Sequence, residues 1–492
     1  MPIPVESFFL APGAGGGLQQ RIRQMVTDAI LSGRFRAGEK LPSSRGLADH
    51  LGVSRLTVTL AYTELVAGDY LVARGRSGYF ISNSAPRPPE FPTGSAARKD
   101  SVDWARRTGL RFSSAPDLAR PGDWRSYPFP FIYGQADASL FDHQNWRQCA
   151  LQALGRRDFE TLTADTYTRD DPMLIDYILR TILPRRGIAA RPEEVLLTLG
   201  AQNALWMAAE ILLGPGTLAV QENPSYSGLR VMLGQHPCHR AFVDVDADGL
   251  PPEAIPKGAD VVFTTPSHQS PTNATMPVVR RLALLDRARD EDFLIVEDDY
   301  EFEMSFLKPA SPALKSLDQE GRVIYVGSFS KSLFPGLRLG YLVASAPFIR
   351  EARSLRTSVL RHPPGHIQRT CAYFLALGHY DSLLNRMAQS FRRRRQAMDE
   401  AIADVGLAVA GAGAFGGSSF WMRAPEGTDC DALALRLRAR GVLIEPGRLF
   451  FDPASAPGNY YRLAYSSIAQ GRIAEGIGLI GTEIGGDAYA HT

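Results

Sequence analysis

The sequence contains little cysteine and no long apolar run. Its 492 residues include only four cysteines, and no two of them form a CxxC pair. Cysteines this sparse build neither a disulfide framework nor a zinc site, so we expect a reducing, cytoplasmic setting and no bound metal. No run of 18 or more apolar residues occurs, and the N-terminus lacks the pattern of a secretory signal. We therefore expect no membrane partner.

Lysine is also scarce. Only six of the 54 basic residues are lysines: Lys40, Lys99, Lys257, Lys308, Lys315 and Lys331. A lysine inside a chemically suggestive motif is therefore less expected by chance. The formal net charge is +2, but basic residues exceed acidic ones over residues 1–125, and acidic residues exceed basic ones in the remainder. This asymmetry hints at a polyanionic partner for the N-terminal part.

The chain is too long for one ordinary domain, and 45% hydrophobic with 22% charged residues is a globular composition. We predict three parts. Residues 15–82 form a small N-terminal domain, and residues 83–129 form a flexible, proline-rich linker. Residues 130–482 form an α/β domain with a smaller α+β subdomain over about 385–482.

The N-terminal part has the pattern of three helices followed by a hairpin. Apolar residues recur at helical spacing over residues 18–30. Ser43 or Ser44 can cap a second helix, Gly52 ends it, and Ser54 can cap a third. Two short apolar runs around a basic, glycine-bearing turn over 70–82 predict a two-stranded wing.

This arrangement is a winged helix-turn-helix, a frequent reader of DNA. Arg55, Thr57 and Thr59 lie near the start of the third helix, where base edges of a major groove can be reached. Arg45, Arg74 and Arg76 flank that helix and are suited to phosphates. A solvated basic face on any small helical domain would show the same pattern.

The exact residues of this segment are a more specific signal than the pattern of helices. The run "ILSGRFRAGEKLPSSRGLADHLGVSRLTVTLAYTELVAGDYLVARGRSGYFI" closely resembles the winged helix-turn-helix of GntR-type bacterial repressors. The resemblance implies that the chain binds promoter DNA. It also implies DNA contacts by the matching residues, which are Arg45, Ser54, Arg55, Thr57, Arg74 and Gly75.

From about residue 130, short β-rich runs alternate with helical stretches, which predicts a mostly parallel sheet covered on both faces. Open sheets of this kind bind ligands beyond the carboxyl ends of their strands. Lys331 lies just after the run ending at Val326, with Ser328, Ser330 and Arg338 nearby. A lysine that forms an imine and donors for a phosphate are two requirements of a pyridoxal phosphate site. Alternatively, Lys331 is a solvated loop lysine.

Other requirements of that cofactor have candidates too. Asp298 follows a buried run and can hold a pyridine nitrogen protonated, and Tyr300 can donate to the phenolate oxygen. The Ala201 and Gln202 amides at a strand-to-helix turn suit a phosphate, and Tyr226 offers a ring for stacking. Each candidate also has an ordinary alternative. Asp298 could be an acidic strand end that faces water, the turn before Ala201 could be an ordinary glycine turn, and Tyr226 could be a core tyrosine.

The order of these motifs resembles fold-type I pyridoxal phosphate aminotransferases, and more closely the aminotransferase-like domain of MocR/GabR-type regulators. The matching stretches are "TPSHQSPT", "EDDYEFE", "VIYVGSFSKSLFPGLRLGYLV" and "YYRLAYS". The resemblance implies that Lys331 forms the internal aldimine, Asp298 and Tyr300 contact the ring, and Tyr226 stacks on it. It implies that Ser328, Ser330, Arg338, Ala201 and Gln202 serve the phosphate. Arg462 matches the arginine that clamps an effector carboxylate.

Three departures from the pattern affect these assignments. Asn273 stands where most relatives have glycine after Pro-Thr. Asp171-Pro172-Met173-Leu174 replaces a glycine-bearing stretch that lies by the substrate entrance in aminotransferases. The asparagine that often touches the phenolate oxygen is absent, and Gln269 or Ser270 is nearest to its place. We assign Gln269 to the cofactor site.

These observations favour a regulator that senses a small amino compound by aldimine exchange at Lys331. An active aminotransferase with an appended DNA-binding module is an alternative, and an inert dimerisation scaffold is another. Relatives respond to compounds such as 4-aminobutyrate, taurine, ectoine-derived amines or pyridoxal phosphate itself, and Arg462 favours an amine that carries an anionic group. The resemblance also implies a head-to-tail homodimer.

Overall fold

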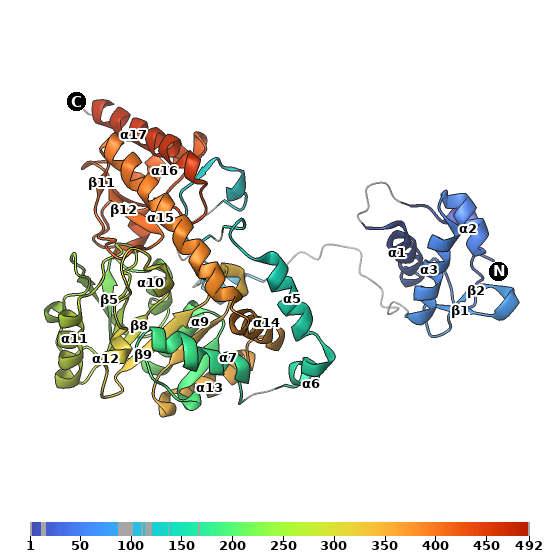
Figure 1. Cartoon of the computed structure of the whole chain (residues 1–492), viewed down its shortest axis with the longest axis horizontal. Helices are drawn as coiled ribbons and strands as arrows, with labels where there is room; N and C mark the ends of the chain where they lie inside the picture. Colours follow the sequence, from blue (N-terminus) through green and yellow to red (C-terminus); the bar gives the residue numbers. More distant parts are fainter. Residues whose placement is uncertain are drawn as a thin grey trace. The chain divides into compact units, whose positions relative to one another are not determined.

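The computed structural model describes residues 2–10, 16–86, 102–109, 112–113, 121–135, 137–165 and 168–490, without the side chains of Arg76 and residues 487–490. The chain divides into two compact units, Met1–Asp103 and Trp104–Thr492 (Figure 1). Much of the predicted linker lies outside the described residues. Among those that are described, no helix is long and apolar enough to cross a membrane.

The first unit consists of three helices and a two-stranded antiparallel sheet. These are α1 (Leu18–Leu31), α2 (Ser44–Leu51), α3 (Arg55–Ala67), β1 (Leu71–Ala73) and β2 (Tyr79–Ile81). Ser43 caps α2 by accepting from the Gly46 amide, and Ser54 caps α3 by accepting from the Thr57 amide. Gly52 ends α2 in the left-handed region, as the sequence predicts.

Residues ahead of the first helix belong to the core of this unit. The side chain of Phe8 is fully buried and that of Ile3 nearly so. The Ile3 amide donates to the Lys40 carbonyl, and Lys40 in turn bridges to Phe80 of the wing. The N-terminal segment therefore extends the winged unit beyond the predicted three helices and hairpin.

The second unit is built on a seven-stranded sheet in the order β4-β10-β9-β8-β7-β5-β6. Its strands are β4 (Val195–Thr198), β5 (Leu218–Asn223), β6 (His239–Asp244), β7 (Val261–Thr264), β8 (Leu294–Asp298), β9 (Val323–Ser328) and β10 (Gly340–Val343). Every pairing is parallel except those of β10, which runs against both β4 and β9. This confirms the predominantly parallel sheet.

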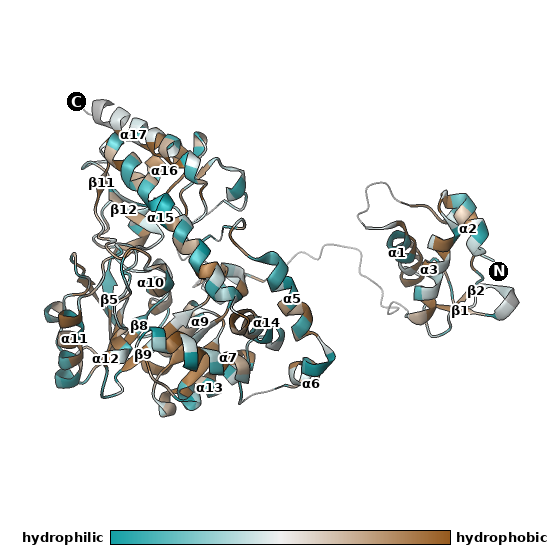
Figure 2. Ribbon diagram, in the orientation of Figure 1, coloured by the Kyte–Doolittle hydropathy of each residue, from teal (hydrophilic) through white to brown (hydrophobic). Residues whose placement is uncertain are grey.

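Helices cover both faces of this sheet (Figure 1). One face packs on α9 (Ala201–Leu212), α10 (Ser227–Leu233) and α13 (Ala346–Leu360). The other packs on α7 (Pro172–Tyr177), α11 (Val278–Glu291), α12 (Leu314–Leu317) and α14 (Gly365–Ala376). The central strands β8 and β9 are accordingly apolar over most of their length (brown in Figure 2), and Glu297 and Asp298 end β8. The remaining helices of this part are α4 (Trp104–Thr108), α5 (His143–Ala153), α6 (Arg156–Thr163) and α8 (Leu183–Arg185).

A smaller subdomain follows, as the sequence predicts. Its antiparallel sheet has the order β11-β12-β15-β14. The strands are β11 (Ala408–Val409), β12 (Ser419–Arg423), β14 (Glu445–Pro446) and β15 (Tyr460–Ala464), and the helices are α15 (His379–Val405), α16 (Cys430–Ala439) and α17 (Ile473–Ala490). A short parallel pair joins β3 (Phe129–Pro130) to β13 (Val442–Leu443). The incoming chain is thus attached to the small subdomain.

The acidic run that begins within β8 lies inside the protein. Glu297 accepts hydrogen bonds of 2.8 Å from the Leu314 and Lys315 amides at the start of α12. Asp299 forms a buried ion pair with Arg186, at 2.6 Å. Glu303 accepts from the Tyr380 hydroxyl, at 2.8 Å. Partners of this kind make the burial of a carboxylate tolerable.

Glu303 gives a prediction about stability and pH. Burial raises the pKa of its carboxyl from 4.5 to about 7, helped by Asp299 nearby. The folded state therefore holds this proton more tightly than the unfolded state does, and this contribution to stability is lost as pH rises from about 4.5 to 7. We expect Glu303→Gln to raise the free energy of unfolding at pH 8 by on the order of 2 kcal/mol.

The gain should shrink towards pH 5, where wild-type Glu303 is protonated. Chemical denaturation followed by circular dichroism at both pH values measures it. Exposed Glu160→Gln is the control and should show no such pH dependence. An equal gain at both pH values would contradict the buried charge as its cause.

Candidate cofactor site and DNA-binding surface

A cavity of about 240 Å³ opens at the carboxyl ends of β8 and β9 and the start of α9. The structure brings ten of the predicted site residues to its wall: Ala201, Gln202, Tyr226, Asp298, Tyr300, Ser328, Ser330, Lys331, Arg338 and Arg462. Most follow a strand of the large sheet directly, whereas Arg462 comes from β15 of the small one. The cavity therefore lies where the two parts of the unit meet.

Asp298 is the acidic residue of its run that faces this cavity. Its side chain is buried, and within the described part of the chain Oδ1 has no hydrogen-bond partner. Burial, with Asp299 and Glu222 close by, raises the pKa of the carboxyl to about 7. A cationic N–H donor brought into the cavity would relieve this cost. The residue thus fits a protonated pyridine nitrogen.

The opposite end of the cavity suits a phosphate. Helix α9 starts after Gly200 with no side-chain cap, so its first amides face the cavity end where Ala201 and Gln202 lie. Gly200 has φ +83°, and a Cβ there would lie 3.4 Å from the Arg338 guanidinium. Arg338 donates to the Leu199 carbonyl at 3.0 Å, and Ser328 and Ser330 add hydroxyl groups. Amides, hydroxyls and a guanidinium are the donors that a phosphate dianion needs.

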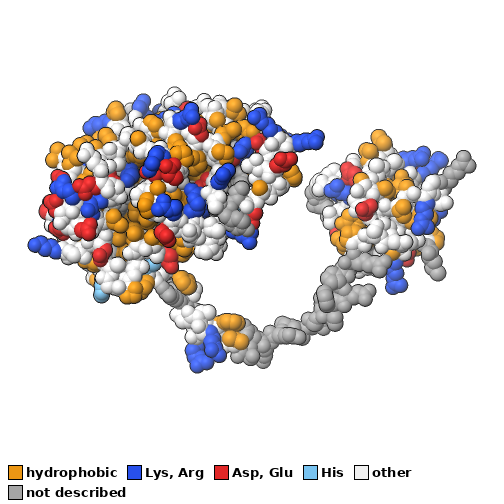
Figure 3. Space-filling view, turned by 90° about the horizontal axis from the view of Figure 1, so that it is seen from below, with side chains coloured by type: hydrophobic (Ala, Val, Ile, Leu, Met, Phe, Trp, Pro, Cys, Tyr) orange, Lys and Arg blue, Asp and Glu red, His pale blue; other side chains and the backbone are white. Residues whose placement is uncertain are grey.

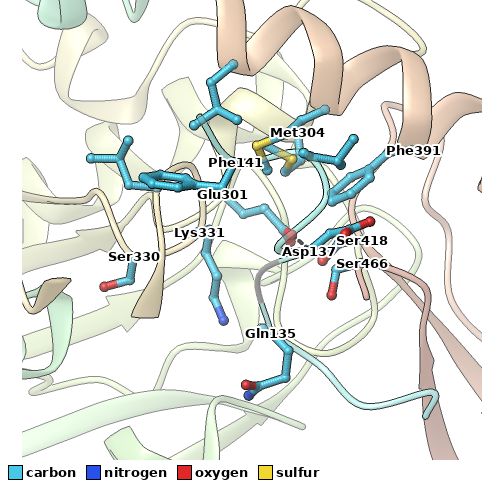
Figure 4. A pocket seen from close by; sticks show the side chains of 15 residues that line it. Gln135, Asp137, Phe141, Glu301, Met304, Ser330, Lys331, Phe391, Ser418 and Ser466 are labelled. Carbon is cyan, nitrogen blue, oxygen red and sulfur yellow. Dashed lines mark hydrogen bonds between the residues drawn. The ribbon is translucent and has the colours of Figure 1, made fainter. Parts of the chain in front are cut away.

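Lys331 lines the cavity, and its Nζ points towards Gln135, another residue of the lining (Figure 4, which draws the adjoining pocket that shares both residues). It lies 3.9 Å from the centroid of the Tyr133 ring. A Cβ on Gly134, whose φ is +73°, would come within 2.2 Å of Nζ. The positive φ favours glycine here, and a larger residue would also displace the lysine amine from its present position.

Arg462 is held rigidly at the mouth of the site. Its Nε donates to Glu445 at 2.8 Å in a buried ion pair. The guanidinium also lies 4.1 Å from the centre of the Tyr133 ring and 4.6 Å from that of Phe450. This fixed orientation suits two-point recognition of a carboxylate or sulfonate.

Tyr300 and Tyr226 also line the cavity, as predicted. Burial, with Glu301 next in effect, raises the pKa of Tyr300 well above its ordinary value, so this hydroxyl stays protonated and can donate. Tyr226 stands at the start of α10 and packs over Gly228. A donor and a ring are what the phenolate oxygen and the face of the cofactor require.

The structure corrects the assignment of Gln269 to the cofactor site. Its amide is fully buried behind the cavity, where it donates to Glu222 at 3.1 Å and to the Pro224 carbonyl at 2.7 Å. The next residue, Ser270, lines the cavity instead. In this turn, adjacent residues therefore have different roles: Gln269 supports the cavity from behind and Ser270 lines it.

The two other departures from the family pattern lie outside the cavity. Asn273 takes the left-handed conformation that glycine favours, with φ +59°, and its amide donates to the Ser419 carbonyl at 2.6 Å. Asp171 caps α7 and pairs with buried Arg369 at 2.6 Å. The stretch from Asp171 to Leu174 therefore supports the core and is not part of the cavity wall.

Sequence reasoning missed Tyr133, Gly134 and Glu301. The Tyr133 hydroxyl donates to Glu301 at 3.1 Å, and Ser418 donates to the other oxygen of the same carboxylate. Tyr133 and Gly134 stand at the start of the domain, far in sequence from Lys331. Glu301 belongs to the acidic run, but nothing in a single sequence tells it from its neighbours.

The predicted DNA-contacting residues lie on α2, α3 and the wing of the first unit. Arg45 is exposed in the first turn of α2, Ser54 and Arg55 are exposed at the start of α3, and Arg74 and Gly75 are exposed in the wing. Thr57 and Thr59 are half-buried; the Thr57 hydroxyl bonds with Ser54, and the Thr59 hydroxyl donates to the Arg55 carbonyl. Figure 3 shows Lys and Arg side chains gathered on the face of this unit that is in view. A basic face around a helix start suits a DNA groove.

Comparisons with known proteins find relatives for both units of the chain. Residues 18–81 match the model for bacterial regulatory proteins of the gntR family, and residues 137–464 match the model for aminotransferase class I and II. The chain is 63% identical over 483 residues to the HTH-type transcriptional regulator TauR of Rhodobacter capsulatus, covering 98% of this chain and 99% of that one. It is 31% identical over 383 residues to the probable rhizopine catabolism regulatory protein MocR of Rhizobium meliloti, covering 77% and 76%.

Solved aminotransferases share the fold of the second unit. The α-aminoadipate aminotransferase LysN of Thermus thermophilus, bound to N-(5'-phosphopyridoxyl)-L-leucine, matches with a TM-score of 0.70 and 26% identity, over 79% of this chain and all of that one. The kynurenine aminotransferase of Pyrococcus horikoshii matches with a TM-score of 0.68 and 25% identity, over 75% and 95%. The cofactor of this domain is pyridoxal phosphate, and the cavity described above fits it.

A DNA-binding helix-turn-helix and a pyridoxal phosphate domain of the aminotransferase type are thus joined in one chain. The protein belongs to the MocR-type transcriptional regulators of the gntR family.

Proposed function

We propose that this regulator senses a short amino compound that also carries an anionic group. The single observation that supports the proposal is that one cavity contains both Lys331 and Arg462. The amine of the effector would compete with Lys331 for the cofactor, and its anion would bind Arg462. Taurine and 4-aminobutyrate are suitable probes because each joins a primary amine to a strong anion.

When bound, pyridoxal phosphate supplies an aldehyde carbon that condenses reversibly with primary amines, and a ring whose absorption reports that change. The protein residues position it. The Asp298 carboxylate would keep the pyridine nitrogen protonated, Tyr300 would donate to the phenolate oxygen, and Tyr226 would stack. Ser328, Ser330, Arg338 and the first amides of α9 would hold the phosphate. Lys331 is the amine that the effector must replace.

We further propose that two chains pair head to tail, as in the fold-type I proteins that this domain resembles. A homodimer would present two winged units, so we expect two half-sites in the promoter. We also propose a cytoplasmic location, because the promoter DNA of a bacterium lies there. Sedimentation velocity of the holoprotein tests the dimer.

An active aminotransferase is a second candidate because the cavity retains Lys331, Asp298 and Tyr226. Multiple turnover with an amino acid and 2-oxoglutarate, at the same rate with and without residues 1–82, would favour it. For the sensing role we expect at most a slow half-reaction.

The sensing role makes a spectroscopic prediction. Titrating the wild-type holoprotein with taurine or 4-aminobutyrate should shift its visible absorption, and ethylamine should do so much less because it has no anion for Arg462. Lys331→Ala should lose both the lysine-linked visible band and the response of DNA binding to the probe. Exposed Lys308→Ala is the matched control and should keep both.

The variant Arg462→Gln distinguishes the contribution of the effector's anion from that of its amine. It should retain the lysine-linked band but bind taurine at least tenfold more weakly, because a charge-assisted, two-point contact is worth about 1.5–3 kcal/mol. Undiminished discrimination between taurine and ethylamine in this variant would exclude Arg462 as the anion site.

The DNA-binding surface gives a separate prediction. Arg55→Ala should weaken binding to a selected promoter duplex by about tenfold or more, because one base contact of arginine is worth about 1–3 kcal/mol. Electrophoretic mobility shift at fixed salt measures it. Arg34→Ala, an exposed arginine outside the helix-turn-helix, should change affinity far less. Equal losses in the two variants would indicate only a general charge effect.

A further inference from the structure

The segment that leads from the linker into the aminotransferase domain forms part of the cofactor cavity. Tyr133, Gly134 and Gln135 all line the cavity. Residues just before them are bonded to the small subdomain: the Phe131 amide donates to the Leu443 carbonyl at 2.9 Å, and the Ala464 amide donates to Phe131 at 3.1 Å. Any signal that travels along the chain from the cavity to the winged unit passes through this segment.

Tyr133 is the point where the two halves of the effector site meet. Lys331 Nζ lies 3.9 Å from its ring centroid, and Arg462 Cζ lies 4.1 Å from the same centroid. The two cationic groups are therefore no more than about 8 Å apart, the sum of these distances. The ring attracts both cations, and its hydroxyl is tied to Glu301.

An effector changes both of these contacts at once. Its amine would displace Lys331 from the cofactor and release the lysine amine as an ammonium beside the Tyr133 ring, and its anion would offset the charge of Arg462. Gly134 adds a direct contact, since Nζ packs so closely against its backbone that a Cβ there would lie 2.2 Å from it. A change at either cation therefore alters the forces on this segment directly.

We propose that Tyr133 is the positioning residue that couples effector occupancy to the linker, and so to DNA affinity. This inference rests on the proposed sensing function. A ligand shifts such an equilibrium only through contacts that differ between two states. The Tyr133 ring, held by Lys331 from the large sheet and Arg462 from the small one, is a contact that occupancy must change.

The test measures two quantities on the full-length holoprotein, with taurine and 4-aminobutyrate as probes. One is the change in visible absorption, and the other is the ratio of operator Kd with and without saturating probe. In the wild type we expect a ratio of about fivefold or more in either direction. In Tyr133→Leu the absorption change should persist, and the ratio should fall below about twofold.

Phe450→Leu is the matched control because Phe450 covers the other side of Arg462 but lies outside the segment. It should shift the probe concentration needed and keep the wild-type ratio at saturation. Tyr133→Phe, which keeps the ring but frees it from Glu301, should at least halve the ratio. The proposal is overturned if both Tyr133 variants keep the wild-type ratio, or if Phe450→Leu loses it equally. An unchanged wild-type absorption with both probes would instead overturn the sensing function.

An independent observation concerns helix α3. Its inward residues Val58, Ala61, Tyr62 and Leu65 are fully buried. Its outward side also has apolar residues, since Leu56 is 67% exposed and Leu60 is 43% exposed. A surface helix normally presents polar residues outward, so a second apolar side indicates a surface that is covered in the working complex.

Leu56 lies next to Arg55 in the first turn of the helix that enters the DNA groove in winged helix-turn-helix proteins. Leu60 follows one turn later on the same side. The apolar group exposed in a major groove is the 5-methyl group of thymine. We infer that Leu56 contacts a thymine methyl group and thereby contributes to the choice of operator.

Uracil substitution tests this contact, because it removes the methyl group and nothing else. A duplex selected from a random pool by the full-length protein is remade with one thymine at a time replaced by uracil. Wild type should lose about fourfold in affinity at one thymine of each half-site. Leu56→Ala should bind the unmodified duplex more weakly and lose nothing further at that position.

Leu18→Ala, also an exposed leucine of this unit, should retain the wild-type response to uracil. Equal binding to an unrelated duplex by all three proteins would show that the folds are intact. The inference fails if uracil has no effect at any position, or if Leu56→Ala remains as sensitive as wild type.

Discussion

Asp298 is buried and its Oδ1 has no hydrogen-bond partner among the residues that the structure describes, and the site depends on this constraint. The acidic residues on either side of it each have a protein partner, because Glu297 accepts from the amides at the start of α12 and Asp299 pairs with Arg186. Asp298 instead faces the cavity, and its raised pKa reflects the cost of leaving it there. A pyridinium nitrogen supplies the missing donor and charge. The fold thus keeps one carboxylate poorly solvated so that one specific ligand can stabilise it.

Much of this could be predicted from the sequence because it is encoded locally. The caps Ser43 and Ser54, the left-handed Gly52 and the apolar strands each depend on a few neighbouring residues. The large-sheet cofactor residues were found because they follow strands or open helices, where α/β proteins place ligands. Those signals exist within a few residues of the site itself.

The errors and omissions came from contacts between distant segments. Gln269 and Ser270 differ by one position, and which of them faces the cavity depends on Glu222, which lies 47 residues from Gln269. Tyr133 reaches Lys331 and Arg462 only after the incoming chain pairs with β13 and β15. No local pattern predicts such a pairing, because it depends on how the two subdomains pack.

Two of the three departures from the aminotransferase pattern lie outside the cavity, and this bears on how a regulator is built on an enzyme fold. Asn273 bonds to Ser419 of the small sheet, and Asp171 bonds to Arg369 in the core, so neither touches the cavity. Most groups suited to the ring and phosphate are retained, and these two changed residues lie in the supports, whereas Ser270 lines the cavity near the place of the missing asparagine. In the proposed sensor, binding must be converted into movement rather than turnover. Substitutions in the supports, one of them at the junction of the two subdomains, would change that conversion and leave the recognition groups in place.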